Sequence, residues 1–201
     1  MQASAAAAKA EEAWIEPALH NQNIVRGAAI VAAVAAAAKA TAFLPSTVAT
    51  YVHLMAFAMW VGTNAYTTFV AGITLFKNLP RQTFGRVQSK LFPVYFAINS
   101  ACIVLCLGTA LLRGDMASSV TTLGAALACT LGNQFALEPM TTDNMFKRYA
   151  MESDGQQETP GYQALKKKFG PLHGISSLLN LVALMCAAAH GYTLAGMFPV
   201  A

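Results

Sequence analysis

Two long stretches of this chain carry no charged side chain at all. Neither Leu91–Leu112 nor Pro171–Ala201 contains an Asp, Glu, Lys or Arg. A helix on the surface of a water-soluble domain keeps a polar face, so uncharged runs of this length are rare there. Each run is long enough to cross the hydrocarbon core of a bilayer as a helix, which takes about 20 residues. The chain is therefore predicted to be an integral membrane protein built from helices.

The composition agrees with this interpretation and does not indicate a nucleic-acid partner. Hydrophobic residues make up 56% of the chain and charged residues only 11%, whereas soluble domains carry about 25% charged residues. The formal net charge of +4 does not indicate a nucleic-acid partner, because no basic stripe with interleaved aromatic residues stands outside the connections between apolar segments. The lipid bilayer is the expected environment, and other membrane proteins are the expected partners.

Four segments are predicted to span the membrane, and one further segment has two interpretations. The Ala-rich segment Ile24–Leu44 either spans or lies on the membrane surface, because Ala is nearly neutral for insertion and Lys39 favours a position near an end. The fold class is predicted to be all-α, a polytopic membrane helical bundle with four core helices and a possible fifth N-terminal helix. The four predicted spans are Val48–Phe76, Leu91–Leu112, Val120–Leu137 and Leu172–Met197.

The expected organisation has three parts, and the basic residues predict its orientation. A polar tail covers 1–23, an Ala-rich helix covers 24–45, and the four-helix domain covers 46–201 with a long polar loop at 139–171. The connection Lys77–Lys90 holds four Lys or Arg and the long loop holds five, whereas the opposite side, with the N-terminal region, holds four. Since Lys and Arg are enriched on the inner side of membranes, these two connections are predicted to face the cytoplasm, or the matrix or stroma of an organelle.

Seven polar residues from three separate segments are predicted to gather at this same face. A carboxylate at the depth of Glu138 needs a partner. Arg81 is the first candidate, because its guanidinium can bond a carboxylate with two N–H groups, and Lys90 is the alternative. Such a cluster is either a structural ion pair or a binding site for an anionic headgroup or a small solute. The seven residues are Arg81, Gln88, Lys90, Glu138, Thr141, Thr142 and His173.

Polar residues also occur within the predicted spans. Each span contains one asparagine, and each amide is expected to face the bundle, where it bonds a neighbouring helix or lines a path for a solute. His53 and His190 are both predicted near the opposite face, as hydrogen-bonding groups or as weak candidates for haem or metal ligands. The four asparagines are Asn64, Asn99, Asn133 and Asn180.

Several short sequence motifs resemble those of a known family. The chain resembles the transmembrane protein 205 family over about Val52–Gly196. The resemblance implies a four-helix membrane domain with no established enzymatic reaction. Its architecture is similar to that of the copper-resistance-D-like group, whose relatives include haem-linked proteins. The motifs on which the resemblance rests include Thr68-Phe69-Val70-Ala71-Gly72, Leu79-Pro80-Arg81, Val87-Gln88-Ser89-Lys90-Leu91-Phe92-Pro93, Leu137-Glu138-Pro139 and His173-Gly174.

The function predicted from these observations is non-enzymatic, because none of the common catalytic motifs occurs. The first hypothesis is an accessory, scaffolding or trafficking component of a membrane assembly. It is favoured by Gly124, Ala128 and Gly132, which recur every four residues and allow close approach of another helix. The alternatives are a small-solute or metal-ion carrier that uses the asparagines, and a haem- or metal-binding protein that uses His53 and His190.

Overall fold

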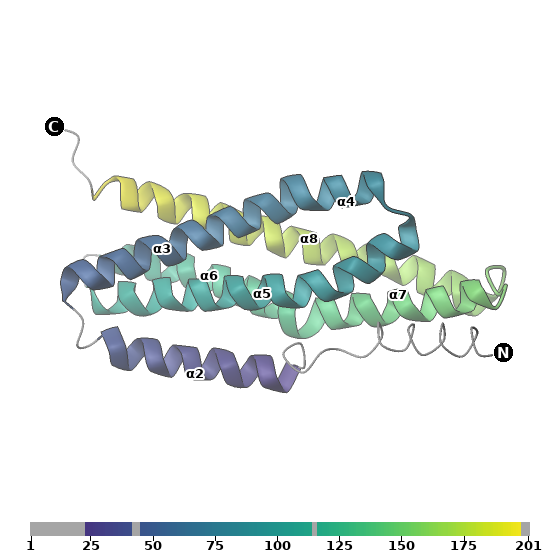
Figure 1. Cartoon of the computed structure of the whole chain (residues 1–201), viewed down its shortest axis with the longest axis horizontal. Coiled ribbons are helices and arrows are strands. Elements are labelled where there is room, and N and C mark those ends of the chain that lie inside the picture. Colours follow the sequence, from purple (N-terminus) through teal and green to yellow (C-terminus); the bar gives the residue numbers. More distant parts are fainter. Residues whose placement is uncertain (1–22, 42–44, 114–115, 198–201) are drawn as a thin grey trace, which may run out of the picture.

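The computed structural model describes residues 23–41, 45–113 and 116–197, and the regular elements in these ranges are all helical (Figure 1). Two short π-helical segments, η2 (Tyr66–Ala71) and η4 (Asn133–Leu137), join α3 to α4 and α6 to α7 as continuous rods. The helices are α2 (Asn23–Thr41), α3 (Ser46–Ala65), α4 (Gly72–Asn78), α5 (Arg81–Leu112), α6 (Ala117–Gly132), α7 (Glu138–Ser153) and α8 (Pro160–Ala195).

Three of these rods are long and apolar enough to cross a membrane: α5, the continuous rod Ala117–Ser153, and α8. They contain most of the second, third and fourth predicted spans. The rod formed by α3, η2 and α4 is not among the three, because His53, Asn64 and several threonines interrupt its apolar residues. The protein is therefore a helical membrane protein in a lipid bilayer, while the predicted number of four core spans is not confirmed.

The segment 139–171 is not a long loop, and here the sequence-based prediction is wrong. α7 continues the third span to Ser153, and α8 already begins at Pro160. Pro139 is the second residue of α7 and Pro160 is the first residue of α8, where a missing backbone N–H is tolerated, whereas Pro171 lies inside α8 and does not end it. The 16 residues of α7 extend the rod by about 24 Å. α7 and the first part of α8 therefore project together at one end of the bundle (Figure 1).

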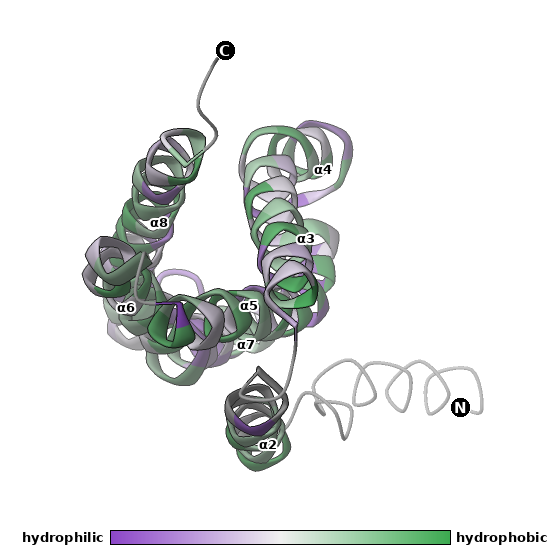
Figure 2. Ribbon diagram, turned by 90° about the vertical axis from the view of Figure 1, so that its left-hand side faces the viewer, coloured by the Kyte–Doolittle hydropathy of each residue, from purple (hydrophilic) through white to green (hydrophobic). Residues whose placement is uncertain are grey.

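The helices are arranged as an open V around a shared core. Seen along the bundle, the α3–α4 rod and α8 form the two arms, and α5 and α6 form the base (Figure 2). The core is formed by Trp60 of α3, Ile103 of α5, Leu123 of α6 and Ala187 of α8, which are all fully buried. The buried core therefore contains side chains from every long rod of the bundle.

The Ala-rich segment is helical, as predicted, over its described part. α2 packs against α5 on the outer side of the base (Figure 2). Nothing in the structure places α2 across or along a membrane, so its position relative to the membrane stays a prediction. Residues 42–44 and almost the whole predicted tail 1–23 lie outside the described residues.

Candidate functional site

A cavity of about 810 Å³ lies at the projecting end of the bundle. One wall comes from η2 and α4, another from α8, and the remainder from α5 and α7. We call it the α4–α8 cavity. Its volume is in the range of about 300–1,000 Å³ that is usual for small-molecule sites. The aromatic residues in its walls are Phe76, Phe84, Phe92, Phe96, Tyr149 and Phe169.

Most of the polar cluster predicted from the sequence lines this one cavity. Lys90 is not among the lining residues. The other members come from α5, α7 and α8, so three segments that are distant in the sequence do meet at one end of the bundle. The lining members are Arg81, Gln88, Glu138, Thr141, Thr142 and His173.

Arg148 and Lys166 also line the cavity. The predicted polar cluster did not include them, because their segment was expected to be a loop. The signal was the helical spacing. The lining residues of α7 recur at intervals of three or four, which is the period of one helix face. They are Glu138, Thr141, Thr142, Met145, Arg148 and Tyr149.

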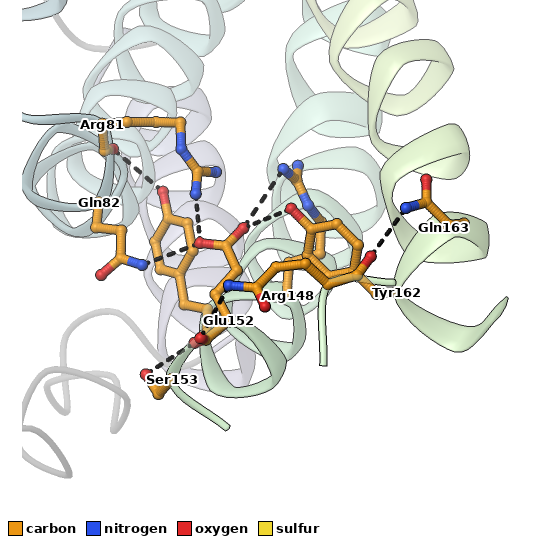
Figure 3. Close-up of polar contacts among 9 residues, drawn as sticks. Arg81, Gln82, Arg148, Glu152, Ser153, Tyr162 and Gln163 are labelled. Atoms are coloured by element: carbon orange, nitrogen blue, oxygen red, sulfur yellow. Dashed lines mark hydrogen bonds and ion pairs between the residues drawn. The ribbon is translucent and has the colours of Figure 1, made fainter. Parts of the chain in front are cut away.

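Glu152, one turn beyond the cavity on α7, organises the outer end of the site (Figure 3). Its carboxylate accepts hydrogen bonds from the guanidinium of Arg81, from Gln82 Nε2 at 2.9 Å and from the Tyr162 hydroxyl at 2.8 Å. Arg148 Nη2 lies 3.9 Å from the same carboxylate.

The predicted partner of Arg81 is therefore wrong, because Arg81 bonds Glu152 and not Glu138. The cause is the helical continuation through Pro139, which carries Glu152 outward to the level at which α5 begins. Glu138 lies at the inner end of α7, where its carboxylate is buried and accepts a hydrogen bond from the Thr142 hydroxyl at 3.0 Å.

Arg148 has an unusual environment for a cation. Its side chain is only 11% exposed. The guanidinium carbon lies 5.8 Å from the ring centre of Tyr162 and 5.1 Å from that of Phe169, which are cation–π distances. Its Nε atom has no hydrogen-bond partner. Arg148 is thus a cation that two rings hold in place beside the cavity, with hydrogen-bonding capacity that the described residues do not fill.

The inner end of the cavity is a neutral polar network between α3, η2, α5 and α8. Asn180 Nδ2 donates to the Thr68 hydroxyl at 3.0 Å, and the Tyr95 hydroxyl donates to Asn180 Oδ1 at 2.5 Å. Asn64 Nδ2 lies 3.5 Å from the same oxygen. Thr68 belongs to the π-helical segment η2, and such segments are frequent beside functional sites. This network is where an uncharged polar group of a ligand could bind.

The four asparagines do not surround one continuous path. Only Asn180 lines the α4–α8 cavity. Asn64 contacts Asn180, and Asn133 donates from Nδ2 to the backbone oxygen of Ser176 at 3.1 Å. Asn99 is buried on α5. The geometry therefore does not favour a path through the bundle centre that uses all four amides.

His53 and His190 meet inside the bundle and not at its surface. Their Nε2 atoms are 2.8 Å apart, and His53 Nδ1 lies 2.6 Å from the Thr109 hydroxyl oxygen. Two axial histidines of a haem bind opposite sides of the iron, with the macrocycle between them. A direct hydrogen bond between the rings leaves no room for that group, so the pair does not fit a haem. In the described ranges no three His, Cys, Asp or Glu side chains converge as a metal site.

The fold and the cavity define a helical membrane protein with a ligand-sized site at one end. Comparisons with known proteins agree with an integral membrane protein, and the resemblance to the transmembrane protein 205 family is confirmed. Residues 55–150 match a family described as a domain of unknown function, DUF4149.

Two curated relatives show how far the similarity extends. The chain is 26% identical to transmembrane protein 205 of Danio rerio, over 67% of this chain and 85% of that protein. It is also 26% identical to xanthocillin biosynthesis cluster protein D of Aspergillus fumigatus, over 71% of this chain and 86% of that protein. No solved structure matches the chain.

Proposed function

We propose that this protein binds a small amphiphilic molecule in the α4–α8 cavity and acts as a binding or carrier protein of the membrane. The observation that carries the proposal is the composition of the cavity wall. Aromatic rings form its surface between two polar regions, one around Arg148 and the other around Asn180. A site of this size with a few placed polar groups is typical of small-molecule recognition.

The length of the cavity supports a ligand with an extended apolar part. Lys166 and Asn180 both line it and both belong to α8. At 1.5 Å per residue, the distance between them along the helix is about 21 Å. A ligand that reaches both polar regions therefore needs an elongated body between them, which the phenylalanine rings would contact.

Filling the cavity from α8 is expected to abolish binding. Gly170 lines the cavity, and a Cβ built there meets nothing within 4 Å, so Gly170→Leu adds volume to the cavity without a backbone clash. We expect molecules that co-purify with the wild-type protein in mild detergent, detected as added mass by native mass spectrometry, to be lost from Gly170→Leu.

The matched control is Gly174→Leu, one turn further along α8. Gly174 is also free of atoms within 4 Å of a built Cβ, but it is not among the residues that line the cavity. This variant should retain the co-purified molecule. Equal retention by both variants, or no bound molecule on the wild type, would contradict the proposed function.

The accessory or scaffolding role is a second proposal, which one observation favours. A Cβ at Gly124 meets nothing within 4 Å, and Ala128, one turn later on α6, is exposed. The described helices of this chain leave Gly124 and Ala128 uncovered, whereas a Cβ at Gly132 would lie 3.6 Å from Leu179 of α8. A helix of another membrane protein could therefore approach the Gly124–Ala128 part of this face closely. Gly124→Leu is expected to lower the recovery of a co-purifying membrane protein, whereas Gly174→Leu should not. Unchanged recovery would count against this role.

A further inference from the structure

The charges in the wall of the α4–α8 cavity are unequal. Three cations line it, Arg81, Arg148 and Lys166, against the single carboxylate of Glu138. Arg81 is bonded to Glu152, which lies outside the cavity lining. Glu138 accepts a hydrogen bond from a neighbouring threonine. The positive charge that faces the cavity therefore comes chiefly from Arg148 of α7 and Lys166 of α8.

Arg148 is prepared to bind an anion. The carboxylate of Glu152 already accepts three closer donors, from Arg81, Gln82 and Tyr162, so Arg148 contacts it only at 3.9 Å. Tyr162 and Phe169 hold the guanidinium in position, and its Nε lacks a partner. A planar guanidinium with donors to spare suits a carboxylate or a phosphate, which it can bond with two N–H groups.

α8 adds polar groups on the same side of the site. Lys166, Phe169 and His173 follow one another at intervals of three and four residues and all line the cavity. The Phe169 and His173 rings are stacked, with centres 5.8 Å apart. Phe169 thus contacts Arg148 of α7 and His173 of its own helix, so the basic groups of the two helices lie around one aromatic ring.

The apolar part of the cavity is open towards the lipid. Ile73 and Phe76 of α4 and Leu181 of α8 line the cavity and are also exposed. These residues belong to the two arms of the V, which face each other across the open side of the bundle (Figure 2). An acyl chain can therefore leave the cavity sideways into the bilayer while its headgroup stays among the basic residues.

We propose that the occupant of the α4–α8 cavity is an anionic lipid from the surrounding bilayer. Its phosphate or carboxylate group binds Arg148 and Lys166, and its acyl chain lies along the phenylalanine wall and passes between α4 and α8. This assignment rests on the proposed function, because it names the ligand class of the same cavity.

The test uses the full-length protein in nanodiscs of phosphatidylcholine that contain a minor fraction of phosphatidylglycerol. Native mass spectrometry counts the lipids that stay bound to the protein after it is released from the nanodisc. We expect the wild type to retain phosphatidylglycerol about tenfold more strongly than phosphatidylcholine, as one charge-assisted hydrogen-bonded pair allows. Lys166→Gln and Arg148→Gln should each reduce this preference severalfold, and Arg148→Lys should restore part of it.

Lys167→Gln is the matched control, because Lys167 is the next residue of α8, is exposed and does not line the cavity. It should leave the preference unchanged. Lys166 is itself exposed, so Lys166→Gln keeps the test valid even if Arg148→Gln fails to fold. Bound inorganic phosphate with no retained lipid on the wild type would overturn the assignment to a lipid.

Different results would contradict the anionic class of the ligand and the use of the cavity as a binding site. If Gly170→Leu removes bound lipid while the wild type shows no preference for phosphatidylglycerol, the cavity binds a ligand and the anionic class is wrong. If Gly170→Leu retains lipid like the wild type, the cavity is not the binding site and the proposed function itself is wrong.

Discussion

Replacing Glu152 with alanine is expected to lower the free energy of unfolding by about 3 kcal/mol. The Glu152 side chain is 8% exposed and joins three elements, because its partners are Arg81 and Gln82 of α5, Arg148 of α7 and Tyr162 of α8. Its removal leaves the buried Arg148 without its nearest carboxylate and deprives three further donors, Arg81, Gln82 and Tyr162, of their acceptor. Thermal unfolding of both proteins in the same detergent measures the effect.

The matched control is Asp143→Ala on the same helix. Asp143 pairs with Lys147 at 2.7 Å, but both side chains are 61% exposed. An exposed pair one turn apart contributes only about 0.5 kcal/mol. If Glu152→Ala lowers the free energy of unfolding no more than Asp143→Ala does, the hydrogen bonds of Glu152 do not hold α5, α7 and α8 together.

Gly85→Ala is expected to destabilise the protein by about 2 kcal/mol, although alanine favours a helix more than glycine. A Cβ at Gly85 would lie 2.2 Å from the Tyr149 hydroxyl oxygen and 2.5 Å from Met145 Sδ. α7 packs directly against α5 at Gly85, beside the cavity. The clash would push the two helices apart and weaken the hydrogen bond from the Tyr149 hydroxyl to the Arg81 backbone oxygen, which is 3.2 Å long.

Two further variants separate this clash from other effects of the substitution. Tyr149→Phe removes the atom nearest to the new Cβ, and the Met145 side chain is flexible enough to move, so Gly85→Ala combined with Tyr149→Phe should recover most of the loss. Gly124→Ala, where a Cβ meets nothing within 4 Å, should instead be neutral or stabilise by up to about 1 kcal/mol. Additive losses from Gly85→Ala and Tyr149→Phe would contradict the proposed contact.

The sequence alone was sufficient to predict the class of protein and to place several polar residues at the end of the bundle where the cavity lies. Charge-free runs such as Leu91–Leu112 are local properties of the chain, and they correctly predicted membrane helices. The alternation of spans also predicted which residues share an end of the bundle. Glu138 and His173 line one cavity with Arg81 for this reason. The spacing of Arg148 on α7 carried the same information, but the prolines in that segment suggested a loop.

The tertiary structure alone decided which of these residues contact one another. Arg81 bonds Glu152, 71 residues away, because α7 stays helical to Ser153 and brings that carboxylate, and not Glu138, to the start of α5. His53 and His190 bond each other because α3 and α8 cross at that depth. Sharing an end of a bundle follows from helix order, which the sequence contains. A particular contact depends on helix length, rotation and packing to within about an ångström, and these are set only when all the helices pack together.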